Sequence, residues 1–151
     1  MLVQYSGLVL LVPLTALIVE DFRSRTVGLG WLVALAVISA LVSVYIGGLR
    51  LAVTNTALNA LLLLYLTGGI AVYVRMRRGR WMNPLKEYIG AGDVLFLAAL
   101  VPLFDLRGYL LFMIGASVFS LLWAKSRRRV PFVATAGIAL SVVLIYRSII
   151  V

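Results

Sequence analysis

The sequence contains no cysteine and no histidine among its 151 residues. These absences exclude disulfide bonds, thiol catalysis, c-type haem, iron–sulfur clusters and zinc sites built from these side chains. They also exclude imidazole as a general base. We therefore expect no metal and no cofactor. Acid–base chemistry depends mainly on five carboxylates, which are Glu20, Asp21, Glu87, Asp93 and Asp105.

Charged residues are scarce as well, at 13% of the chain, whereas apolar residues make up 64%. Soluble proteins typically have about a quarter charged and roughly half apolar residues. A water-soluble chain of this length could not bury so much apolar surface. The composition therefore predicts a membrane protein.

Long uncharged stretches divide the chain into candidate membrane spans. Five of them contain 17 to 24 residues: 2–19, 27–49, 51–74, 108–124 and 130–146. A transmembrane helix needs about 20 mostly apolar residues, with about 17 as a lower limit. A sixth span, 88–104, is long enough only if it includes Asp93. We predict an all-α, polytopic membrane protein with about six transmembrane helices, forming a single domain over residues 1–151.

The positive charges are distributed unevenly over the connections between these spans. Eleven of the fourteen Lys and Arg residues lie on one side of a six-span arrangement. By the positive-inside rule this side is cytoplasmic, and both termini lie on the other side. We therefore assign the net charge of +9 to orientation and lipid headgroups, and we expect no nucleic-acid partner.

The same topology brings two carboxylates to the cytoplasmic membrane face. Asp21 ends the first span and Asp93 begins the fourth. An ionisable residue at membrane depth costs about 3 kcal/mol or more, so it is a candidate functional residue. Two neighbouring carboxylates tend to share a proton, which lets one activate water while the other protonates the substrate. Such an aspartate pair could hydrolyse a peptide bond.

Each half of this pair also has a simpler interpretation. Gly90 and Gly92 could open a helix that Asp93 caps, and Asp21 could be an ordinary loop acid. In the catalytic interpretation, the two glycines instead allow another segment or a substrate to approach closely. Glu20 projects about 100° from Asp21 on a continuing helix, so we expect it to be solvated.

Three short motifs, in this order, resemble one known family. Asp21 is followed by Arg23 and Arg25, residues 90–93 read Gly-Ala-Gly-Asp, and Val130-Pro131-Phe132 precedes the last span. Together with the six-span layout, they resemble the prepilin peptidases, or type IV leader peptidases, of the G-x-G-D membrane aspartyl proteases. The resemblance implies catalysis by Asp21 and Asp93, with Gly90 and Gly92 in the active-site loop. It is to the short, peptidase-only form, because the chain lacks the paired cysteines of the bifunctional members.

The resemblance also implies a substrate and a location. The substrates would be prepilin-like precursors, cut at the cytoplasmic face of the inner (cytoplasmic) membrane by a multi-pass enzyme. Arg23, Arg25 and Lys86 are candidate contacts to substrate or lipid. Two positions depart from the family, because Thr26-Val27-Gly28 stands where many members have a proline and Leu95 stands where many have a lysine.

Two other functions fit the same residues. A small proton-coupled transporter could use Asp21, Asp93 and the polar residues Asn55 and Asn59 of the third span, although inverted repeats are not evident. For these asparagines, hydrogen bonding between helices is the simpler interpretation, because residues four apart share a helix face. The third candidate is a non-catalytic assembly protein that keeps the fold.

Overall fold

The structure is a computed structural model that describes residues 6–24, 27–78, 90–124 and 132–150. These residues form helices joined by short connections, and no strand occurs among them. The expected all-helical fold is therefore confirmed. In chain order the elements are η1 (Ser6–Leu10), α2 (Leu11–Ser24), α3 (Leu29–Arg78), α5 (Ala91–Ala99), α6 (Leu106–Ala124) and α7 (Phe132–Ile150).

Two of these helices are long and apolar enough to cross a membrane. The candidate spans are Leu29–Arg77 in α3 and Leu106–Trp123 in α6, and α7 adds a shorter apolar stretch, Phe132–Tyr146. Only 28% and 17% of the most apolar windows of the two spans are buried inside the protein. The core helix of a soluble protein would be mostly buried, so the outward-facing apolar side chains support association with a membrane.

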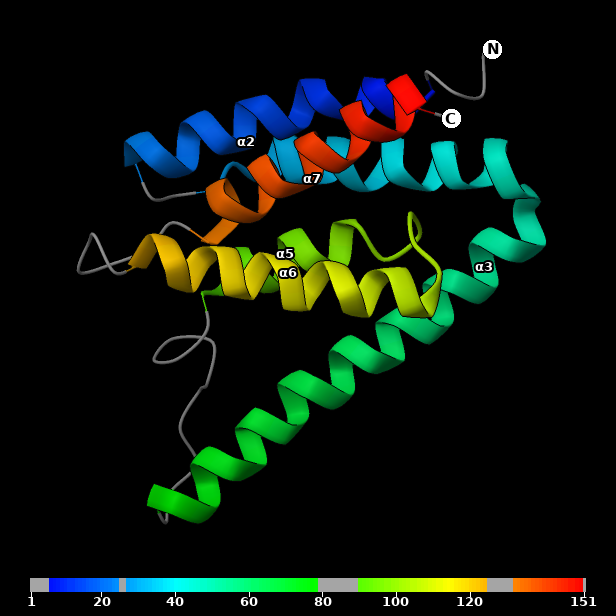
Figure 1. Ribbon diagram of the computed structural model, residues 1–151. Helices are drawn as coiled ribbons and strands as arrows, with labels where there is room; N and C mark the ends of the chain where they lie inside the picture. Colours follow the sequence, from blue (N-terminus) through cyan, green and yellow to red (C-terminus); the bar gives the residue numbers. More distant parts are fainter. Residues whose placement is uncertain (1–5, 25–26, 79–89, 125–131, 151) are drawn as a thin grey trace.

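Helix α3 contains both the second and the third predicted span. Its 50 residues would measure about 75 Å if straight, more than twice the hydrocarbon thickness of about 30 Å. The helix is interrupted at Gly48, which has φ 77° and ψ 166°, a conformation that residues with a Cβ atom rarely adopt. Gly48 divides α3 into a first arm (residues 29–47) and a second arm (residues 49–78). The second arm turns back and runs diagonally away from the other helices (Figure 1).

Helix α5 is too short to cross a membrane as a helix. It ends at Ala99 and is followed by a turn at residues 100–104, where Pro102 cannot donate a backbone hydrogen bond. The carbonyls at the end of a helix have no partner within it and are costly to leave unpaired in an apolar environment. Here side chains of other helices supply the donors. Ser39 Oγ donates to the Ala99 carbonyl, and Tyr109 Oη adds a second donor, at 3.0 Å, to the Leu97 carbonyl, which also accepts the Leu100 N–H at 3.1 Å.

Asn59 supplies hydrogen-bond donors to the turn after α5. Its side chain is fully buried, and Nδ2 donates to the carbonyls of Val101 at 2.9 Å and Phe104 at 2.7 Å. Asn59 therefore bonds to a segment distant in sequence, but its acceptors belong to the turn after α5 and not to a second helix as expected. These bonds connect the second arm of α3 to the turn after α5, and they hold α5 in place from its far end.

The hydrophobic core lies between α2, the first arm of α3, α5 and α7, with one contribution from α6. Most of the second arm lies outside it. Burying a leucine or phenylalanine side chain contributes about 2 kcal/mol, so this cluster fixes how the four elements pack. Its buried members are Leu10, Leu14, Leu17, Leu32, Leu35, Phe96, Ala99, Leu100, Ala116, Val133, Ala136 and Leu140.

The role of Asn59 predicts a loss of stability in Asn59→Leu. Removing the amide leaves two turn carbonyls without donors, which costs on the order of 2 kcal/mol. We expect the midpoint of thermal unfolding in detergent to fall by several degrees. Asn55→Leu is the matched control, since Asn55 is half-buried one turn earlier on the same helix. Equal unfolding midpoints for the two variants would contradict this role.

Candidate functional site

Asp21 lies in the last turns of α2 and is buried, with 6% of its surface exposed. Its Oδ2 atom accepts a hydrogen bond from the backbone N–H of Ala134 at 2.7 Å. Ala134 belongs to the first turn of α7, where the N–H groups lack partners within the helix and the helix dipole is positive. Both features stabilise a negative charge on Asp21.

Close packing of α2 against α7 makes this hydrogen bond geometrically feasible. A Cβ atom at Gly137 would lie 2.8 Å from Ile18 Cγ1, so only glycine allows the two helices to come this close. Ile18 precedes Asp21 by three residues, and Gly137 follows Ala134 by three. Residues three apart share a helix face, so the close contact and the hydrogen bond lie one turn apart on the same seam.

Contacts from α6 support this end of the seam. The hydroxyls of Ser120 and Thr135 form a buried hydrogen bond between α6 and α7. The Trp123 ring lies 6.3 Å from that of Phe22 on α2, measured between centroids, within the range of favourable aromatic pairs. The beginning of α7 is therefore held by both α2 and α6.

Asp93 lies in the first turn of α5, outside the candidate membrane spans, and is half-buried. Burial, followed by the nearby charge of Asp21, raises the pKa of Asp93 to about 6, although a hydrogen bond with the Gly90 backbone opposes the shift. The structure therefore brings together Asp21 and Asp93, as the sequence predicts. Their surroundings differ, because the start of a helix stabilises the Asp21 carboxylate, whereas partial burial and the Asp21 charge let Asp93 keep its proton to a higher pH.

Gly90 and Gly92 each allow a close approach to the site. A Cβ atom at Gly90 would lie 2.8 Å from Asp93 Oδ2, and one at Gly92 would lie 2.9 Å from Val27 Cγ2. Gly90 thus leaves room for the Asp93 carboxyl group, whereas Gly92 lets α5 pack on the connection between α2 and α3. Gly90 is also the N-cap of α5, without a side-chain capping bond. Asp93 is therefore not the N-cap residue itself, but its carboxylate bonds to the Gly90 backbone, so the helix-start interpretation holds in part.

Glu20 has a different position from the one expected. It is half-buried, and its Oε2 accepts a hydrogen bond from the Gly28 N–H at 2.8 Å. The expectation of a solvated side chain is therefore wrong, because Glu20 bonds the residue just before α3. This bond holds the connection beside Val27, on which Gly92 packs.

The predicted contact residues are only partly described. Arg23 lies in the last turn of α2 with an exposed side chain, while Arg25 and Lys86 lie outside the described residues. Leu95 is 47% exposed on α5. Asp105 is exposed beyond the far end of α5, where its carboxylate accepts a bond from the Gly108 N–H at 3.2 Å. It is therefore separate from the aspartate pair.

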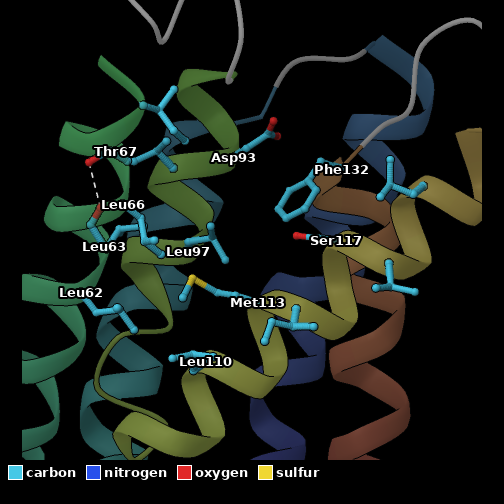
Figure 2. Close-up of a pocket in the computed structure, with 15 residues that line it drawn as sticks. Leu62, Leu63, Leu66, Thr67, Asp93, Leu97, Leu110, Met113, Ser117 and Phe132 are labelled. Atoms are coloured by element: carbon cyan, nitrogen blue, oxygen red, sulfur yellow. Dashed lines mark hydrogen bonds between the residues drawn. The ribbon is translucent and has the colours of Figure 1, made fainter. Parts of the chain in front are cut away.

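An apolar groove of about 630 Å³ begins at Asp93. It lies between the second arm of α3, α5 and α6, with Phe132 of α7 near the same end as Asp93 (Figure 2). Among the described residues, no group of three or more acidic side chains comes together to hold a metal ion. The site therefore contains two carboxyl groups in different surroundings at the end of an apolar groove.

The helix terminus that pairs with Asp21 is not predicted by any motif recognised in the sequence. Pro131 was a usable signal, since proline is common at the first positions of a helix, and α7 indeed begins at Phe132. The bond to Ala134 could not be read from this signal. It depends on the register in which α2 packs on α7.

The Gly92–Val27 contact predicts a rescue between two variants. Gly92→Ala places a methyl group against Val27 and shifts Asp93, and a misplacement of about 1 Å can lower a rate on the order of a hundredfold. Adding Val27→Ala makes room again, so we expect the double variant to recover most of the peptidase activity proposed below. Gly90→Ala is the control, because its methyl group meets Asp93 itself and Val27→Ala offers no relief. Equal responses of both glycine variants to Val27→Ala would argue against this packing role.

Comparisons of the chain with protein-family models, curated proteins and solved structures give no match. The function therefore has to be inferred from the residues of the site and their geometry.

Proposed function

We propose that the protein is a membrane aspartyl endopeptidase that removes leader peptides from type IV pilin-like precursors. The observation that carries this proposal is the asymmetric aspartate pair. Asp21 accepts a hydrogen bond from a backbone N–H at the start of a helix, whereas Asp93 is half-buried and its pKa is raised, in part by the Asp21 charge. A pair with one carboxylate and one carboxylic acid is the starting state that aspartyl proteolysis requires.

The two environments suggest which residue performs which step. The Asp21 carboxylate takes a proton from a water molecule as the water oxygen attacks the carbonyl carbon of the scissile bond. The protonated Asp93 donates its proton to the carbonyl oxygen, which gives a neutral tetrahedral intermediate. When the carbon–nitrogen bond breaks, Asp21 passes its proton to the leaving amine and Asp93 recovers its proton from the hydroxyl group. The products are a carboxylic acid and an amine, and both aspartates return to their initial states.

We place the enzyme in the cytoplasmic membrane as a multi-pass protein with about six crossings. The two arms of α3, together with α6 and α7, would supply four crossings. The segment of η1 with α2 would supply a fifth crossing, and the chain from α5 through its turn would supply the sixth, with Asp93 at the membrane surface where that crossing begins. The end of α2 and the starts of α5 and α7 lie at one end of the bundle (Figure 1). In the sequence, segments rich in Arg and Lys follow α2 and precede α5 and α7, and this charge distribution favours a cytoplasmic active site.

The precursor substrate is proposed from the resemblance of the motifs at Asp21–Arg25 and Gly90–Asp93. A leader peptide joined to an apolar helix would bring its scissile bond to the membrane surface, which is the depth inferred for the aspartate pair. Lipids would be the other partners, and Arg23, Arg25 and Lys86 remain candidate contacts for either. The transporter alternative has less support, because the Asn59 amide is engaged by turn carbonyls.

Replacing either aspartate with asparagine tests the pair. Asp21→Asn keeps an oxygen that can accept the Ala134 N–H but removes the base, and Asp93→Asn removes the acid. We expect both variants to insert normally and to lose at least a thousandfold of the cleavage rate, since each removes an indispensable proton-transfer group. The measurement is the size shift of a type IV pilin precursor co-expressed with each variant.

Asp105→Asn is the matched control and should cleave like the parent, because Asp105 lies away from the pair. Near-normal cleavage by Asp21→Asn or Asp93→Asn would refute the proposed mechanism. Loss of cleavage by all three variants would point to a general effect of charge removal.

The pH dependence follows from the raised pKa of Asp93, about 6. Below this pH Asp93 keeps the proton that the carbonyl oxygen needs, and above it both aspartates ionise. We expect the cleavage rate to fall as pH rises through this range, and to fall again in strong acid when Asp21 is protonated. The measurement is the initial rate in detergent across pH 4 to 9. A rate that is constant from pH 5 to 8 would show that Asp93 is not the acid.

A further inference from the structure

The apolar groove has the second arm of α3 as one wall and α6 as the other, with α5 behind them. Its long axis can be followed along α6 from Leu121 to Leu110, both of which line it. The eleven helical steps between these two residues correspond to about 16 Å, or three turns. Asp93 and Phe132 lie near one end, and Leu62 and Leu110 lie at the other (Figure 2).

The chemistry of the groove is uniform except at the Asp93 end. Apart from Asp93, the only polar lining residues are Thr67 and Ser117. The Thr67 hydroxyl already donates to the Leu63 carbonyl of its own helix at 2.8 Å. The groove therefore fits a ligand that is apolar over about three helical turns and has its reactive group beside Asp93.

We infer that the apolar groove receives the apolar helix that follows the scissile bond of the substrate, and that it selects substrates by this helix. This inference rests on the proposed peptidase function. A peptide in such a groove finds almost no hydrogen-bond partners for its backbone, so it has to satisfy its own N–H and C=O groups as a helix. An extended segment could not occupy this site.

The Asp93 end of the groove accounts for the other half of the substrate. A scissile bond has to leave the helix to become accessible to a water molecule and two carboxylates. Gly90 and Ala91, just before Asp93, are exposed and leave room for an extended leader. The substrate would then change from an extended leader to a helix beside the aspartate pair.

The shape of α3 provides a lateral route into the groove. Beyond Asn59, which bonds the turn after α5, the second arm diverges from the bundle towards its end (Figure 1). Its outward side chains are strongly exposed, with Leu64 at 68% and Tyr65 at 77%. A substrate helix already in the bilayer can enter sideways between the second arm and α6, without leaving the apolar phase.

Cross-linking tests the occupant directly, because the chain has no native cysteine. The probe is a designed precursor with a short basic leader, an apolar helix of about 20 residues and one cysteine placed at successive positions along that helix. Met113→Cys, in an Asp93→Asn background that retains the precursor, should form disulfides at precursor positions three or four residues apart. Leu111→Cys is the matched control, since Leu111 is 59% exposed on α6 and does not line the groove. No disulfides at Met113→Cys, or equal yields at both positions, would overturn the inference.

Cleavage kinetics separate this inference from the proposed function. Met113→Trp fills the groove, so we expect the KM for the designed precursor to rise at least fivefold, while Leu111→Trp leaves it unchanged. A soluble peptide that spans the cleavage site but lacks the apolar helix should be cleaved by the parent, and equally by the control Leu111→Trp. If the parent cleaves neither substrate, the proposed function fails. If the parent cleaves the precursor and Met113→Trp has the same KM, the groove is not the binding site.

A membrane lipid is the other occupant of matching chemistry. A photoreactive phospholipid in the same membranes should label Met113→Cys less when the designed precursor is present. Labelling that the precursor does not reduce would assign the groove to lipid and overturn the inference.

Discussion

One hydrogen bond, from the Ala134 N–H to Asp21 Oδ2, links the fold to the chemistry. A buried carboxylate without a partner is strongly unfavourable, and a helix terminus buried without one is unfavourable too. The bond gives both the carboxylate and the helix terminus a partner. It forms only because Gly137 allows α2 and α7 to come this close. The packing of α2 on α7 and the stability of the charge on Asp21 therefore depend on the same contact.

Asp93 is positioned by a different set of contacts, and this difference makes the aspartate pair asymmetric. At its far end, α5 is held by donors from Ser39, Asn59 and Tyr109. At its near end, α5 packs through Gly92 on Val27. Val27 belongs to the connection that is held by the hydrogen bond between Glu20 and the Gly28 N–H. Asp93 lies in the first turn of α5, where a hydrogen bond with the Gly90 backbone favours its charged form, but partial burial and the nearby Asp21 charge outweigh that bond and raise its pKa.

Several parts of this arrangement could be predicted from the sequence. Hydrophobicity predicted an all-helical chain with membrane-spanning helices, and the expected alternation of spans predicted that Asp21 and Asp93 lie at one level, where the structure has them close enough for the Asp21 charge to raise the pKa of Asp93. Gly92 was recognised as a site of close approach, although its neighbour Val27 was not. The turn after α5, the Glu20 bond and the Ala134 cap were not predictable, because they depend on the register between helices distant in sequence. Hydrophobic periodicity contains no information about that register.

Asp21 and Asp93 lie side by side in the proposed active site. The distance between positions 21 and 93 can be tested without an activity assay. Because no native cysteine interferes, Asp21→Cys can be combined with Asp93→Cys and, as a reference, with Asp105→Cys. A short bifunctional thiol reagent is then added to membrane vesicles whose cytoplasmic face is outward. The arrangement predicts rapid bridging between positions 21 and 93 and none between positions 21 and 105. Failure to bridge 21 and 93, with both thiols shown to react singly, would contradict the aspartate pair on which the proposed chemistry depends.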